Sequence, residues 1–399
     1  MIDRTGRHNR PRRDHPRVAL VDRHVPHYRT ALYTILMGSD RASYHIVAAA
    51  PRNAQSPVRS ENDWPWTDAP ARRIPGTGGR SVWQWGAVKA GFSRRFDTIL
   101  MMANPRDPSL WVCTIAARLT GKRVLMWTHG PKSRRAAQQL VRRLWHRLAT
   151  TLLFYGHRGR MLSVKAGDPP DKCHIVYNSL DYDRQRTLRE TITSQRIRAV
   201  REELFGRRDV PIIICICTLY PDKRVDVLLR AQAALHRRGL EARVLIVGDG
   251  QMRSNLEPLA NELGIASLVR FYGPCYDERR TAELICSADL CVIPSAVGLG
   301  AMHSLAYGVP IITDGDLDTQ SPEVEAIVPG RTGDLCRPDP EELATTIGAW
   351  LNAHPTRDGV ADECIRMIER FYRPQVQAAA IERAVAGELP ITLGNVDKG

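Results

Sequence analysis

Short apolar segments that alternate with amphipathic segments run through most of the chain, and they restrict its fold more than any other feature. Between the apolar segments, stretches such as SLWVCTIAARL (109–119) repeat apolar residues at spacings of three and four, which indicates helices. Buried strands that alternate with such helices predict a parallel α/β sheet. The candidate strands of the first half are RVALVD (17–22), HIVAAA (45–50), DTILMMA (97–103), RVLMWTH (123–129), TLLFYG (151–156) and HIVYN (174–178).

A polar, helix-like stretch at 180–206 separates this series from a second one, so a chain of 399 residues is expected to form two domains. The second series comprises VPIIICICT (210–218), ARVLIVGDG (242–250), LVRFYG (268–273), ADLCVIP (288–294) and VPIIT (309–313). The expected organisation is a disordered basic arm (1–16), an N-terminal domain (17–185), a linker with the C-terminal domain (186–372), and a final helix and tail that pack back on the first domain (373–399).

The basic residues are concentrated in the first half of the chain. Residues 1–190 hold 34 Lys and Arg against 14 Asp and Glu, whereas residues 191–399 hold 23 against 29. Such asymmetry is typical of proteins with an anionic partner, and an Arg-rich genome is the alternative explanation. The chain has no long uncharged apolar run, so we expect a cytoplasmic protein. The nine cysteines lie mostly in apolar runs and are expected to be reduced.

A basic amphipathic helix is predicted after Pro131. It combines arginines with large apolar residues, and seven of the eight tryptophans also lie in the basic half. This pattern suits peripheral contact with an anionic membrane at its inner face, whereas a core-packing helix with one solvated face is the equal alternative. The residues concerned are Arg135, Leu140, Arg142, Arg143, Leu144, Trp145, Arg147 and Leu148.

Loops that follow the strands of the second half carry the features of an anion site. Lys223 lies in a loop between a strand and a helix, where open parallel sheets bind ligands and helix N–H groups meet phosphate. Gly248 ends a strand in LIVGDG and allows close approach of backbone to a ligand. A third loop is expected to present bare amides of Val297, Gly298 and Leu299 to an anion at a helix start.

Together these segments resemble the donor-binding half of the family 4 retaining glycosyltransferases, which have the GT-B fold of two Rossmann-like domains with an interdomain cleft. The resemblance places Lys223 on the donor diphosphate. Thr218 stands where that family has an arginine, and Arg224 could compensate. Ser295 and His303 replace the family's two glutamates, so His303 is expected to bind the ribose, with a helix-packing role as the alternative.

The departure resembles a bacterial branch with a VGLxxxH pattern, here VGLGAMH (297–303), followed by a Pro-Glu-x-Glu-Ala segment, here 322–326. Glu323 and Glu325 are expected to alternate across an extended stretch, so that one of them, Glu325 by preference, faces the donor. The first half resembles the same family through VPHYRTALYTIL (25–36), WTHG (127–130) and VYNSLDYD (176–183). This likeness places His129 at the donor sugar.

The resemblance implies transfer of a sugar, with retention, from a nucleotide-sugar donor to a glycan or lipid-linked acceptor in bacterial cell-surface polysaccharide or glycoconjugate synthesis. His129, Lys223 and Glu325 are the implied catalytic residues. No metal is expected, because GT-B transferases generally need none and the Asp residues of DGDLD (314–318) are ordinary turn residues. A GT-B epimerase or phosphorylase is one alternative. A nucleic-acid or polyanion binder is another, but it would not explain the motifs of the acidic half, so no nucleic acid is expected.

Overall fold

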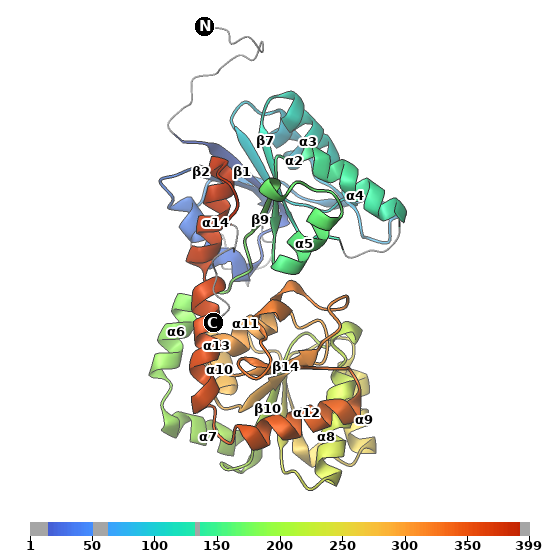
Figure 1. The fold of residues 1–399 in the computed structure, drawn as a ribbon, viewed down its shortest axis with the longest axis vertical. Coiled ribbons are helices and arrows are strands. Elements are labelled where there is room, and N and C mark those ends of the chain that lie inside the picture. Colours follow the sequence, from blue (N-terminus) through green and yellow to red (C-terminus); the bar gives the residue numbers. More distant parts are fainter. Residues whose placement is uncertain (1–14, 51–62, 132–135, 392–399) are drawn as a thin grey trace. The chain divides into compact units, whose positions relative to one another are not determined.

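The computed structural model describes residues 15–50, 63–131 and 136–391 (Figure 1). All but the last two residues of the predicted disordered arm (1–16) lie outside this part of the chain. The chain divides into two compact units. Unit 1 comprises Met1–Val176 with Gln377–Gly399, and unit 2 comprises Tyr177–Val376.

Unit 1 is built on a seven-stranded sheet whose strand pairs are all parallel. In sheet order the strands are β3 (Trp66–Asp68), β2 (Ser43–Ala49), β1 (Arg17–His24), β6 (Thr98–Met102), β7 (Arg123–Thr128), β8 (Thr151–Phe154) and β9 (Cys173–Ile175). A separate antiparallel pair joins β4 (Arg72–Arg73) to β5 (Val82–Trp83).

Successive side chains of these strands point to opposite faces of the sheet and fill two apolar cores. Leu20 of β1 contributes to one core with α1 (Thr30–Met37) and α14 (Pro374–Ala386). Val21 contributes to the other with α2 (Trp85–Phe92) and α3 (Pro108–Leu119). The near-continuous apolar strands of the sequence are explained by this burial on both faces.

Unit 2 has a six-stranded parallel sheet with the order β12-β11-β10-β13-β14-β15. The strands are β10 (Ile212–Ile216), β11 (Arg243–Val247), β12 (Val269–Gly273), β13 (Leu290–Val292), β14 (Ile311–Asp314) and β15 (Gly333–Cys336). The helices are α6 (Tyr182–Thr191), α7 (Ser194–Phe205), α8 (Val225–Arg237), α9 (Arg253–Glu262), α10 (Glu278–Cys286), α11 (Leu299–Ala306), α12 (Pro340–Ala353) and α13 (Asp358–Phe371). The chain order reverses at β10, which has β11 on one side and β13 on the other. The loops after β10 and β13 therefore flank the crevice where such sheets bind ligands.

The prediction of two Rossmann-like α/β domains is confirmed. The polar stretch at 180–206 forms α6 and α7, which belong to unit 2. Four short strands (β3, β4, β5 and β15) were not predicted from the sequence, because two to four residues carry too little pattern to distinguish a strand from a loop.

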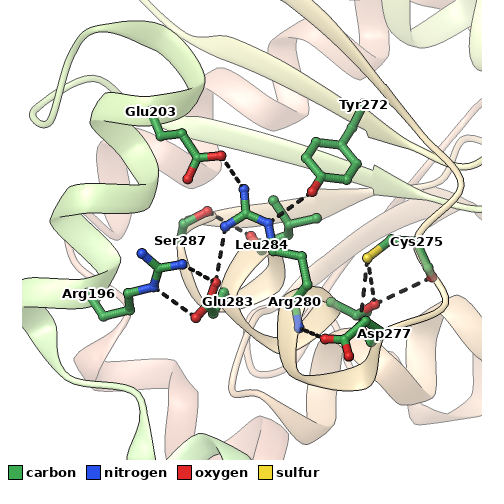
Figure 2. Close-up of polar contacts among 10 residues, drawn as sticks. Arg196, Glu203, Tyr272, Cys275, Asp277, Arg280, Glu283, Leu284 and Ser287 are labelled. Atoms are coloured by element: carbon green, nitrogen blue, oxygen red, sulfur yellow. Dashed lines mark hydrogen bonds and ion pairs between the residues drawn. The ribbon is translucent and has the colours of Figure 1, made fainter.

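An ion-pair network fastens α7 to α10 and β12 in unit 2 (Figure 2). The buried carboxylate of Glu283 accepts hydrogen bonds from Arg196 at 2.6 and 2.8 Å and from Arg280 at 3.0 Å. Arg280 also donates to the hydroxyl of Tyr272 and to Glu203. The hydrogen bonds from Arg196, against a smaller opposing effect of burial, lower the pKa of Glu283. This network holds α7 against α10 and the edge strand β12.

Candidate functional site: the carboxyl ends of β10 and β13

Lys223 reaches from the loop after β10 to the loop after β13. It ends the short 3-10 helix η3 (Pro221–Lys223), and its Nζ donates to the carbonyl oxygen of Ala296. A Cβ added to Gly298 would lie 3.8 Å from this Nζ and 3.9 Å from Oγ of Ser321. A half-buried cation, a glycine and a hydroxyl group thus meet at the switch point of the sheet.

The backbone of the β13–α11 loop is strained where it faces the lysine. Ala296 has a φ of 48°, and Gly298, at the N-cap of α11, has φ 56° and ψ −151°, a combination that only glycine adopts readily. Gly298 has no side chain with which to cap the start of α11. Anion binding by the amides of Gly298 and Leu299 stays a prediction.

The expectation for Val297 is wrong. Its N–H donates to Oε1 of the buried Gln320 at 2.9 Å, and that side chain in turn donates to Oγ1 of Thr313 and to the carbonyl oxygen of Asp314. The N–H group of Val297 therefore stabilises the conformation of the β13–α11 loop. The buried Ser295 lies at the start of the same loop.

Gly248 brings the loop after β11 against the loop after β10. Its φ is 144°, and a Cβ there would lie 1.8 Å from the carbonyl oxygen of Cys217, so only glycine fits. The neighbouring Thr218 is exposed. Arg224, also exposed, pairs with Asp226 at 3.6 Å and has a φ of 52°. The structure thus brings Lys223, Gly248 and the Gly298 loop to one edge of the sheet.

His303 is paired with an acid that was not predicted from the sequence. Its Nε2 lies 3.2 Å from Oε1 of Glu278, which also accepts from Tyr307 at 3.0 Å and from Gln185 at 3.3 Å. Burial alone would raise the pKa of Glu278, but the hydrogen bond and charge of His303, with the two other donors, lower it to about 2. A helix-packing contact is thereby present, and ribose binding by His303 stays a prediction.

We expect the substitution Glu278→Gln to lower the free energy of unfolding near neutral pH by about 3 kcal/mol. A carboxylate whose folded pKa is depressed stabilises the protein above its unfolded pKa of about 4.3, and this contribution is lost as the pH falls toward the folded value of about 2. Denaturant unfolding of both proteins between pH 7 and pH 3 should therefore show that the difference in their free energies of unfolding shrinks as the pH falls. If this difference stays constant, the low pKa of Glu278 does not stabilise the folded protein.

The Pro-Glu-x-Glu-Ala segment is not extended, so the expected alternation of its glutamates is wrong. Residues Pro322–Ala326 form the 3-10 helix η5, because proline at its first position favours a helical start. Glu323 is 5% exposed, and its Oε1 accepts from Nδ2 of Asn178 at 2.8 Å. Glu325 is half-buried, and its charge adds to burial in raising the pKa of Tyr177. The proposed role of Glu325 is not tested by this geometry.

The Asp residues of DGDLD serve their own loop. Oδ1 of the buried Asp314 accepts from the amide of Asp316 at 2.6 Å, and Oδ1 of Asp316 accepts from the amide of Asp318 at 3.0 Å. Within the described ranges, no group of three or more His, Cys, Asp or Glu side chains is arranged to hold a metal ion.

His129 belongs to unit 1 and follows the central strand β7. Its ring stacks on Tyr155 at 4.4 Å, and Tyr155 stacks in turn on Trp127 at 5.4 Å. The buried Arg29 donates to the hydroxyl of Tyr155 at 2.7 Å and lies 4.6 Å above the ring of Trp127. Oδ2 of Asp22 lies 3.3 Å from Nη1 of Arg29, so this carboxylate balances the charge of the guanidinium group. This aromatic and charged cluster lies at the carboxyl ends of β1, β7 and β8, where a ligand of unit 1 would bind.

Several of these side chains were not identified from the sequence. Arg29 ends the 3-10 helix η1 (His27–Arg29) and Tyr155 directly follows β8, and no local pattern indicates that they meet. Gln320, Ser321 and Glu278 carry no sequence signal, because each acts through a partner that is distant along the chain.

The loops described for unit 2 fall within a region that matches a known family. Residues 210–353 match the family described as Glycosyl transferases group 1. The matched region runs from β10 to α12 and contains Lys223, Gly248 and Gly298.

The chain is similar to two curated relatives and to one solved structure. A D-inositol 3-phosphate glycosyltransferase 2 of Catenulispora acidiphila is 32% identical over 220 residues, 51% of this chain and 48% of the relative. A GDP-mannose-dependent alpha-(1-6)-phosphatidylinositol dimannoside mannosyltransferase of Mycobacterium tuberculosis is 26% identical over 340 residues, 81% of this chain and 82% of the relative. The chain spans 48% to 64% of the length of the first three curated relatives it matches.

The Anabaena Alr3699/HepE structure in complex with UDP-glucose covers 93% of this chain and 100% of its own, with a TM-score of 0.70 and 17% identity. At this identity the likeness concerns the fold, and it agrees with the GT-B architecture that the resemblance implied.

Proposed function

We propose that the chain is a glycosyltransferase that takes a sugar from a nucleotide-sugar donor bound by unit 2. One observation carries the proposal: Lys223 and the strained Gly298 loop meet at the switch point of a parallel sheet, inside the region that matches group 1 glycosyl transferases. A lysine and a helix start together offer the donors that a diphosphate needs. The relatives' names, which include GDP-mannose-dependent enzymes, support a sugar-nucleotide donor.

In this proposal Lys223 and the start of α11 stabilise the negative charge that develops on the leaving diphosphate. Arg224 and Thr218 border the same loop, and His303 and Glu323 or Glu325 contact the nucleoside. His129 of unit 1 contacts the transferred sugar, and the product retains the anomeric configuration of the donor. The acceptor is a glycan or a lipid-linked saccharide bound by unit 1, in line with the phosphatidylinositol mannoside in one relative's name.

Calorimetry with a panel of UDP-, GDP-, ADP- and dTDP-sugars tests the donor site, and binding of at least one of them is expected. Turnover of that donor is then followed with and without added glycolipid acceptors. A transferase consumes the donor productively only when an acceptor is present, whereas an epimerase converts the donor alone. Failure of the whole panel to bind would overturn the proposal.

Activity is expected to survive treatment with EDTA, because Lys223 and the backbone dipoles of α11 meet the diphosphate charge. The carboxylates of Asp314 and Asp316 are already occupied by amides of their own loop. The measurement is donor turnover before and after chelation, with addition of Mg²⁺ or Mn²⁺ as the second arm. Loss of activity that either ion restores would return DGDLD to the list of candidate sites.

We also propose that unit 1 contacts an anionic membrane through a face formed by α2, α3 and α4 (Ala136–Leu148). α2 packs against α3 and α3 against α4 (Figure 1). Trp145, which the sequence analysis assigned to the membrane contact, is instead buried and lies 4.6 Å from the ring of Trp111, so it anchors α4 to the unit. These three helices also expose large apolar side chains, namely Trp85, Phe92, Ile115, Leu119, Leu140, Val141 and Leu144.

Charge complementarity supports an anionic bilayer as the occupant of this α2–α4 face. Arg143 and Arg147 are exposed on α4 beside its apolar residues, and α4 contains no acid. Such a mixture of arginines and apolar side chains is typical of interfacial helices. Among the described residues, no helix is both long and apolar enough to span a bilayer. Contact with a membrane would thus be peripheral in the described part of the chain.

The double change Arg143→Glu and Arg147→Glu is expected to release the protein from anionic vesicles. Each cation near the surface contributes on the order of 1 kcal/mol, and salt screens the attraction. Arg142 is half-buried, and burial lowers its pKa, so changing it would disturb the fold and it is left intact. Sedimentation with phosphatidylserine-containing and neutral vesicles measures the effect, with the exposed Arg237→Glu and Arg238→Glu pair of unit 2 as the matched control. Equal binding of the two double mutants would refute the membrane proposal.

A further inference from the structure

Two thiols lie in contact at the point where β10 runs into the lysine loop. Cys215 is the fourth residue of β10, and Cys217 follows the strand directly, so the period of two places both side chains on one face. Their sulfur atoms are 3.7 Å apart. Cys215 is fully buried, whereas Cys217 is half-buried. Both lie in the apolar run IIICIC, from which the sequence analysis expected reduced cysteines.

The two thiols differ in their readiness to ionise. The hydrogen bond with Cys215, with the charge of Lys223 as a smaller contribution, lowers the pKa of Cys217 against the effect of burial. The same hydrogen bond, with burial, raises the pKa of Cys215. Cys217 is therefore the thiol of the pair that ionises more readily. Burial raises the pKa of six other cysteines, Cys113, Cys173, Cys286, Cys291, Cys336 and Cys364, which makes them poor nucleophiles.

We infer that Cys215 and Cys217 form a reversible disulfide in response to a peroxide and that this bond loosens the donor site. The thiolate of Cys217 attacks one peroxide oxygen, the O–O bond breaks, and Cys217 becomes a sulfenic acid while the other oxygen leaves as water. The sulfur of Cys215 then attacks the sulfenic sulfur, which releases a second water and forms the S–S bond. In sum two thiols lose two protons and two electrons, and hydrogen peroxide is reduced to two waters.

The bond would disturb the donor site because its formation moves Cys217. The sulfurs must close from 3.7 Å to about 2.05 Å, and only one residue separates the two cysteines. The backbone of Cys217 has no room to follow freely, since its carbonyl oxygen packs against Gly248 and its N–H donates to Val247 at 3.1 Å. A shift of the backbone at Cys217 would displace the loop after β10, which carries Lys223 six residues further along the chain. Strained disulfides are readily reduced, as a reversible switch requires.

The first experiment counts thiols and does not depend on the donor. The full chain is treated with hydrogen peroxide, free thiols are alkylated after denaturation, and the intact mass and peptides are measured. We expect the Cys215–Cys217 peptide to remain unalkylated and to weigh about 2 Da less than the same peptide with two free thiols, in the wild type and in Cys275→Ser. Cys275 is the matched control, because it is the other half-buried cysteine. Cys215→Ser and Cys217→Ala should not show the decrease, and its absence from the wild type would overturn the inference.

The second experiment rests on the proposed function and measures donor affinity. Oxidation should weaken binding of the sugar nucleotide identified by the panel at least 10-fold, and dithiothreitol should restore it. Oxidation of Cys217→Ala should leave its affinity unchanged. A disulfide that forms without any change in affinity would overturn the link to the donor site. If the reduced protein binds no sugar nucleotide, the proposed function fails, while the thiol count still decides whether the disulfide forms.

Discussion

Replacing Lys223 with alanine is expected to weaken nucleotide-sugar binding by roughly 10- to 100-fold. Hydrogen bonds to charged groups contribute about 1.5–3 kcal/mol, and a factor of ten corresponds to about 1.4 kcal/mol. A Cβ added to Gly298 would lie 3.8 Å from Nζ of Lys223 and 3.9 Å from Oγ of Ser321, so the lysine lies beside the start of α11. Calorimetric titration of the donor into wild type and variant measures the change.

The control for this variant is Arg230→Ala, which removes an exposed cation from α8, the helix that follows the lysine loop. Its donor affinity should equal that of the wild type. A dissociation constant that is the same for Lys223→Ala as for the wild type would remove Lys223 from the site and leave the helix start and Arg224 as candidates for the diphosphate.

The substitution Gly248→Ala should have the largest effect on stability, above about 3 kcal/mol. The added Cβ would lie 1.8 Å from the carbonyl oxygen of Cys217, and the φ of 144° is strained for any L side chain. Neither backbone can yield without breaking the hydrogen bonds from Cys217 to Val247 and from Gly248 to Gly273. Urea denaturation measures the loss, and donor binding should fall with it because Cys217 leads into the lysine loop.

Gly359→Ala serves as the matched control, since this glycine lies in α13 and a Cβ there would meet no atom within 4 Å. Its free energy of unfolding should be unchanged or higher by up to about 1 kcal/mol, the difference in helix propensity between the two residues. If Gly248→Ala is as stable as this control, the loops after β10 and β11 do not pack as closely as the distance between Gly248 and Cys217 indicates.

The motifs of the acidic half identified the loops of the candidate site but not the contacts within them. Lys223, Gly248 and Gly298 could be predicted because each follows a strand whose apolar pattern is clear. Val297 could not be judged in this way, since its amide is taken by Gln320, 23 residues further along the chain. His303 likewise meets Glu278, 25 residues before it. Such pairings depend on how helices and loops pack, and no local pattern records them.

The sequence by itself determined the class of the fold, because strands buried on both faces must be apolar throughout and their helices must carry an apolar stripe. It also indicated where loops come close to one another, because only glycine tolerates the backbone at Gly248 and Gly298. The tertiary structure alone decided which side chains meet: the proline-led helix of Glu323, the Trp145 anchor of α4 and the Arg29–Tyr155 cluster. The physical reason is that local pattern reflects burial and backbone conformation, whereas partners far apart in sequence are set by packing.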